Sequence, residues 1–196
     1  MKTVLILAAA ATLGVVAPLA PIASAQTVNT TGDQAASQLE LIAQAPSACV
    51  LSPPSAASGA NTSFTAQGGQ AGVVRFTEFV DPQTAQPRDA SISLAFPVVC
   101  NSAHRLLVRT DGTGLSRTAG AAPAAGFRDS LDFQVTAYWA GASASGSSTA
   151  LTPIDLATAN GAAGQMNLVV AVAGGGAPMV AGDYAGTLVV ELEAQN

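Results

Sequence analysis

Apolar residues recur at every second position in several segments of this chain. Side chains along a β-strand point alternately to opposite faces of a sheet, so this period predicts strands with one buried and one solvent-facing side. No segment keeps the period of 3.6 residues that is typical of a helix. The pattern therefore predicts an all-β protein, with its most regular strands at residues 92–100, 105–109, 131–139, 166–172 and 184–192.

Turn-forming residues separate these runs. Two prolines follow Ser52, glycine and small polar residues fill 111–114 and 141–148, and three glycines occupy 174–176. Short alternating runs between such turns favour an antiparallel sandwich or barrel. The stretch 151–163 is compatible with one helical turn or with another short strand. The alternation predicts inward-facing side chains at Ile92, Leu94, Phe96, Leu131, Phe133, Val135, Leu168, Val170, Leu188 and Val190.

The N-terminus has the features of a secretory signal. Lys2 precedes an apolar run over residues 4–17, and Ala23 and Ala25 have the small size and the spacing that signal peptidase requires. We expect cleavage before Gln26. A membrane-spanning helix is the alternative, and it is disfavoured because a proline ends the apolar run early.

The chain of 196 residues then divides into three parts. Residues 1–25 are the predicted signal peptide, and residues 26–37 are a polar extension that we expect to be flexible. Residues 38–196 are long enough for one domain with a hydrophobic core. We expect export through the periplasm, followed by display at the cell surface or secretion.

The two cysteines, Cys49 and Cys100, both lie in the part predicted to be exported. Exported proteins meet an oxidising environment, and an even number of cysteines there indicates a disulfide. A redox pair would be expected to show the short C-x-x-C spacing, and a metal site would be expected to have several histidines nearby; the sequence has neither. We therefore expect one structural disulfide with both sulfur atoms buried.

The charge and the polar residues exclude several functions. Seven basic and twelve acidic side chains give a net charge of −5, which disfavours nucleic acid as a partner. His104 is the single histidine and is expected to be a partly exposed strand residue. No G-x-S-x-G motif is present, and the glycine clusters lack the strand-to-helix context of a phosphate-binding loop. We expect no catalytic, metal or cofactor site, and hence no enzyme activity.

Three motifs occur together in one order. They are QLELIAQAPSACVL before and around the first cysteine, SISLAFPVVCNS followed directly by HRLLVRTDG, and the C-terminal AGDYAGTLVVELEA. DFQVTAYWAG adds a tyrosine-bearing central strand. In these motifs the chain resembles, over residues 38–194, the spore coat protein U-like domain of archaic chaperone–usher pilins.

This resemblance implies an immunoglobulin-like sandwich that lacks its final strand. The open groove would be filled first by a periplasmic chaperone and then, at the outer-membrane usher, by a strand from an identical or related pilin subunit. The expected function is a structural pilus subunit that contributes to adhesion or biofilm formation. The alternative is a self-contained secreted sandwich that acts as a surface or ligand-binding protein.

The resemblance and the alternation together suggest which residues form the joint between subunits. Residues 34–45 are the expected donor strand, with its apolar contacts at Leu39, Leu41 and Ala43. These residues could instead belong to the first strand of their own domain, because the segment runs directly into Cys49. The strand expected to border the acceptor groove carries Tyr184, Leu188, Val190 and Leu192.

Overall fold

The computed structural model describes residues 39–68, 72–150 and 152–195, and these residues form strands and turns but no helix. The predicted signal peptide, the extension 26–37 and the first part of the expected donor strand lie outside the described residues. In the described part, no helix is long and apolar enough to cross a membrane.

The larger sheet is built on two long central strands, β5 (Ala90–Cys100) and β12 (Ala162–Val172), which pair along their whole length. On the far side of β12 follow β9 (Gln134–Trp139) and then β10 (Ala142–Ser147). The free side of β5 is shared by β1 (Cys49–Leu51) and β2 (Ala56–Ala60). The order is therefore β1-β5-β12-β9-β10, and every pair is antiparallel.

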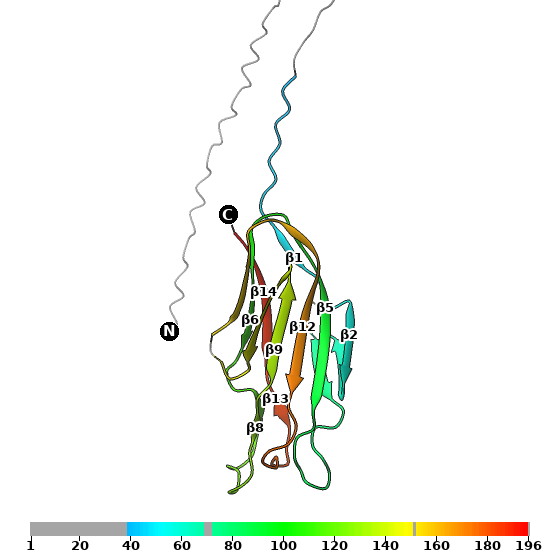
Figure 1. Cartoon of the computed structure of the whole chain (residues 1–196), viewed down its shortest axis with the longest axis vertical. Helices are drawn as coiled ribbons and strands as arrows, with labels where there is room; N and C mark the ends of the chain where they lie inside the picture. Colours follow the sequence, from blue (N-terminus) through cyan, green and yellow to red (C-terminus); the bar gives the residue numbers. More distant parts are fainter. Residues whose placement is uncertain (1–38, 69–71, 151, 196) are drawn as a thin grey trace, which may run out of the picture. The chain divides into compact units, whose positions relative to one another are not determined.

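The second sheet has the order β11-β6-β14, formed by β11 (Ile154–Thr158), β6 (His104–Thr110) and β14 (Leu188–Ala194). It lies behind the first sheet in Figure 1. Two small sheets complete the fold. One joins β13 (Tyr184–Ala185), β7 (Leu115–Arg117) and β8 (Ser130–Leu131), and the other is the hairpin of β3 (Thr62–Ala66) and β4 (Gly72–Phe76).

The hydrophobic core fills the space between the two main sheets, as the alternation predicts. Seven of the predicted core residues are buried, namely Ile92, Leu94, Phe96, Leu131, Phe133, Val135 and Leu168. The other three, Val170, Leu188 and Val190, pack against this core but are only partly buried. The predicted all-β, antiparallel sandwich with one disulfide is thus confirmed.

The topology follows that of immunoglobulin domains, whose strands A, B, E and D form one sheet and C, F and G the other. In chain order β1, β5, β6, β9, β12 and β14 take the places of A to F. Immunoglobulin folds also carry a tyrosine near the start of strand F that bonds back to the backbone. Here the Tyr184 hydroxyl donates to the carbonyl of Val180 at 2.6 Å. Among the described residues no strand occupies the place of G, beside β14.

Three features differ from the sequence-based predictions. Residues 141–148 are not simply a turn, because 142–147 form strand β10 along the edge of the larger sheet. The predicted continuous strand 184–192 is broken after Ala185, so that β13 pairs with β7 and β14 pairs with β6. The predicted strand 131–139 is also broken, because Leu131 belongs to β8, which pairs with β7, and β9 begins only at Gln134. In the stretch 151–163, strand β11 and the start of β12 agree with the predicted alternative of another short strand.

Candidate functional site: an apolar groove beside the last strand

An apolar cavity of about 400 Å³ opens between the two sheets next to β14. Leu188 and Val190 of β14 form part of its wall, and Leu51 and Pro54, in and just after β1, line it from the opposite sheet. Buried core residues form its deeper surface, and the β3–β4 hairpin contributes a further part of the lining. Further lining residues are Phe64, Val74, Phe76, Leu94, Phe96, Leu115, Phe133, Leu168 and Val170.

The partial burial of Val170, Leu188 and Val190 results from this opening. All three belong to the inward-facing set and pack against the core on one side, yet each also borders the cavity. β14 is an edge strand that pairs only with β6 in the described part of the chain. An edge strand presents unpaired backbone N–H and C=O groups, which another strand can pair with. The groove therefore offers apolar contacts and a hydrogen-bonding edge together.

Of the four residues predicted to border the groove, two line it and two do not. Leu188 and Val190 line the cavity, whereas Tyr184 and Leu192 are absent from its lining. Tyr184 lies in β13, where its ring centroid is 5.0 Å from that of Phe79. Burial raises the pKa of the Tyr184 hydroxyl, which stays protonated and holds the corner before β14. Leu192 packs against the core farther along β14.

The sequence did not reveal the wall formed by β1 and the β3–β4 hairpin. Residues 52–66 are rich in proline, serine, alanine and glycine and show no clear apolar alternation. Phe64 and Phe76 are isolated aromatic residues in this stretch and the next strand, and both line the cavity. The turn-like composition concealed β3, whereas a short and less regular apolar run over residues 73–80 overlaps β4.

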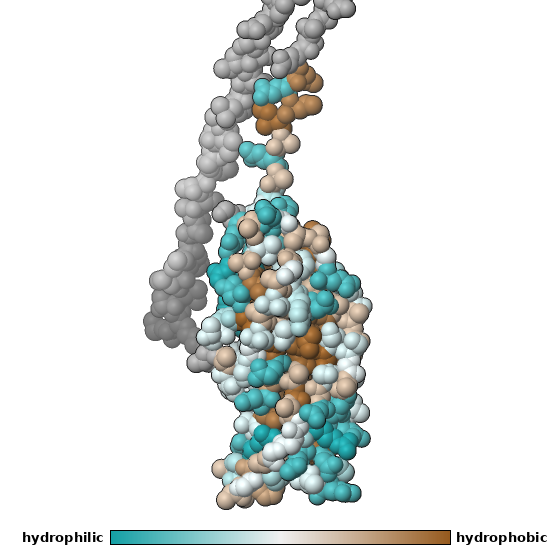
Figure 2. Space-filling view, in the orientation of Figure 1, coloured by the Kyte–Doolittle hydropathy of each residue, from teal (hydrophilic) through white to brown (hydrophobic). Residues whose placement is uncertain are grey.

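The described part of the expected donor segment is exposed. Leu39, Leu41 and Ile42 are 81%, 88% and 82% exposed, and Ala43 is exposed as well. Residues 39–48 belong to no strand, and β1 begins at Cys49. In Figure 2 the stretch that is blue in Figure 1 carries apolar, brown residues. Three large apolar side chains in four positions are thus open to solvent.

The disulfide joins Cys49 to Cys100, as predicted, and these residues are directly paired across β1 and β5. As whole residues, Cys100 is buried and Cys49 is partly buried. The bridge closes a separation of 51 residues and fixes the start of the domain to the end of a core strand.

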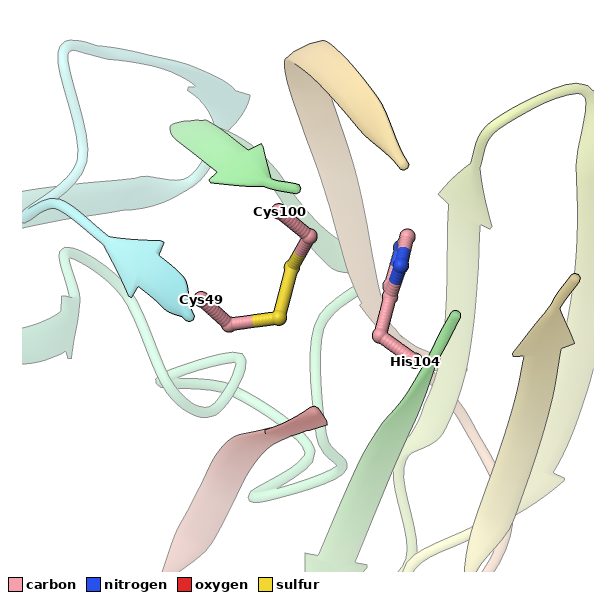
Figure 3. A group of neighbouring side chains, drawn as sticks. All are labelled: Cys49, Cys100 and His104. Carbon is pink, nitrogen blue, oxygen red and sulfur yellow. A yellow bond between two sulfur atoms is a disulfide. The ribbon is translucent and has the colours of Figure 1, made fainter. Parts of the chain in front are cut away.

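His104 lies beside this disulfide, as Figure 3 shows, and it is fully buried instead of partly exposed. The sulfur atoms and a ring nitrogen lie within 4.8 Å of one another, which resembles a set of metal ligands. However, both sulfur atoms are in the S–S bond, and both ring nitrogens are hydrogen-bonded. Nδ1 lies 2.9 Å from the Ser102 carbonyl, and Nε2 accepts from Trp139 Nε1 at 2.7 Å. This pairing fixes the neutral tautomer with the proton on Nδ1, because Nε2 must accept.

Charged residues lie on the outer face of the second sheet, away from the groove. Arg105 of β6 pairs with Asp155 of β11, and Arg109 pairs with Glu191 of β14 at 3.4 Å. The hydrogen bond from Arg105 lowers the pKa of the Asp155 carboxyl. No charged residue is among those that line the groove in the described structure. The groove is therefore suited to an apolar occupant.

Comparison with known proteins gave no match: no family model, no curated protein and no solved structure matches this chain.

Proposed function

We propose that this protein is the structural subunit of a surface fibre of the chaperone–usher type, and that it polymerises by donor-strand exchange. The observation that carries this proposal is the apolar groove beside β14, at the place of strand G in an immunoglobulin fold. A sandwich left open at this place exposes core residues and an unpaired edge, which favours completion by a further strand.

The occupant that the groove fits best is the segment 34–45 of a second copy. Leu39, Leu41 and Ala43 are two residues apart, as side chains on one face of a strand must be. Both leucines are exposed in the single chain, and the groove has no charged lining among the described residues. Burying a leucine side chain stabilises a complex by about 1.5–3 kcal/mol before the cost of association.

We expect this exchange to produce a filament, because head-to-tail contacts extend openly unless their rotation closes a ring. The donor segment and the acceptor groove are different surfaces of the same chain. After each addition, the growing chain of copies still has one empty groove at one end and one unused donor segment at the other. Before assembly the open groove has to be covered. A periplasmic chaperone supplying a temporary strand and an outer-membrane usher are the partners we propose. The fibre would then contribute to adhesion or biofilm formation at the cell surface.

The test uses the full chain, produced in the periplasm with its chaperone. Leu39→Asp/Leu41→Asp should still fold and form the disulfide, but should no longer form heat-stable multimers. Gln38→Asp/Gln44→Asp is the matched control, since it adds the same charges at positions expected to face water. Multimers from the leucine variant at wild-type yield would refute the donor assignment.

A mixing experiment separates donor from acceptor. Val190→Asp should no longer accept a donor segment in its groove but should still donate its own segment. The double leucine variant should no longer donate its segment but should still accept one in its groove. Each variant alone should remain monomeric, and the mixture should form dimers and nothing longer. A wild-type chain that stays monomeric and stable without any partner would favour the self-contained surface or ligand-binding protein instead.

A further inference from the structure

Asn101 holds the backbone of the chain just before β1. Its side-chain Oδ1 accepts from the Ala48 N–H at 2.7 Å, and its Nδ2 donates to the Pro46 carbonyl at 2.8 Å. Its own N–H donates to the Ala48 carbonyl at 3.1 Å. The last contact extends the pairing of β1 with β5 by one residue beyond the Cys49–Cys100 pair. Three hydrogen bonds and the adjacent disulfide therefore fix the point where the expected donor segment joins the domain.

These contacts prevent a turn at the position where the sequence favours one. In a β-turn over residues 45–48, Pro46 would occupy the second position, which proline favours. The turn would be closed by a bond from the Ala48 N–H to the Ala45 carbonyl. In the structure that N–H is already bonded to Asn101. Ala45 is itself restricted to extended conformations because it precedes a proline.

With Asn101 in place, a segment that folds back can turn no later than residues 43–44. Antiparallel neighbours then place Leu41 level with Pro46 and Leu39 level with Ala48. The cavity wall on this side starts at Leu51, three positions beyond Ala48 and about 10 Å away at the rise of a strand. The two leucines would therefore not reach the groove of their own domain.

Without the Asn101 contacts, a two-residue turn at Pro46–Ser47 would change the register. Leu41 would then lie level with Ser52, and Leu39 with Pro54. Both Ser52 and Pro54 line the cavity. The same leucines that miss the groove in the first register would reach it in the second.

We propose that Asn101 is a positioning residue that prevents the donor segment from filling the groove of its own chain. The segment is thereby left for the groove of a second copy, where its register is not limited by the connection to β1. This inference rests on the proposed function, since it names the device that makes donation intermolecular.

The experiment compares Asn101→Ala and Asn101→Asp with the wild-type full chain. Asn101→Ala removes both side-chain contacts. Asn101→Asp keeps an oxygen that accepts from the Ala48 N–H, and so should keep the turn blocked. Asn167→Ala, on the outer face of β12, is the matched control. Multimers are measured by size-exclusion chromatography at one protein concentration, and cleavage after Glu40 by a glutamate-specific protease is measured on the monomer fraction.

We expect at least tenfold fewer multimers for Asn101→Ala, with cleavage of its monomer after Glu40 slowed at least tenfold. Asn101→Asp and Asn167→Ala should behave as the wild type. Wild-type multimer yield from Asn101→Ala overturns the inference, and so does a monomer that is cut as fast as the wild type. Loss of the disulfide or of cooperative unfolding in Asn101→Ala also overturns it, because the residue would then serve folding alone. The wild-type sample reports separately on the proposed function, which fails if no multimers form there.

Discussion

Phe133 connects the stability of the sandwich to the groove, and its replacement by alanine can be worked out from the structure. The side chain is 6% exposed, belongs to the main core and also lines the groove. Removing a buried phenylalanine costs about 3–5 kcal/mol, because transfer energy is lost and a cavity remains. This is a large share of the roughly 5–15 kcal/mol that stabilises a typical domain.

The assay is urea unfolding of the oxidised protein, followed by the fluorescence of Trp139, the single tryptophan, which is buried. With a slope of about 2 kcal/mol per molar urea, the loss corresponds to a midpoint lowered by about 1.5–2.5 M. Phe127→Ala is the matched control, because Phe127 is 46% exposed and its removal should change stability by much less. Equal midpoints for the two variants would show that Phe133 does not support the core as described.

Three further results are expected from the same assay. Replacing Cys49 and Cys100 by alanine should cost about 4 kcal/mol in the chain-entropy estimate for a loop of this length, and an unchanged midpoint would contradict it. His104→Phe leaves the Trp139 N–H without its acceptor and should cost about 1–3 kcal/mol, whereas a neutral effect would mean that water replaces the imidazole. The backbone N–H of Thr113, followed by its hydroxyl, lowers the pKa of the Asp111 carboxyl. The stability from Asp111 is therefore present above its unfolded pKa of about 3.9 and is lost as pH falls through the folded value, so Asp111→Asn should weaken the acid dependence of unfolding.

The strands with regular alternation could be predicted from the sequence because their two faces meet different environments. β5 is the clearest case, since buried residues occupy every second position from Ala90 to Cys100 and the residues between them are only partly buried or, at Val99, exposed. The disulfide was equally predictable, because two cysteines in a chain with a predicted export signal leave one pairing.

The strands that were not predicted lack a regular alternation of apolar and polar residues. β2 is exposed at all five positions, so its sequence AASGA has no apolar face to show. β10 has the sequence ASASGS. These small residues are compatible with an edge strand, but the same composition is typical of a turn. The break between β13 and β14 has a different cause. A Cβ atom at Gly186 would lie 2.5 Å from the Gly114 carbonyl oxygen. The two backbones approach closely here, between β13 and β14, and the alternation of apolar residues does not reveal this approach.

The disagreement between pattern and burial at Val170, Leu188 and Val190 bears directly on function. Their alternation is that of core residues, yet in the single chain they are only partly buried and border an open groove. While the groove is open, these side chains keep part of their apolar surface in contact with water and contribute less to stability. A strand placed beside β14 would bury that surface and add its stabilising free energy. Leu39 and Leu41 show the complementary disagreement, because they alternate like strand residues but are exposed and belong to no strand. Both sets of residues have the alternation of buried strand residues, yet neither set is fully buried in the single chain. A subunit that is completed by a neighbouring copy would require two such sets. This is why we prefer an assembling protein to a self-contained one.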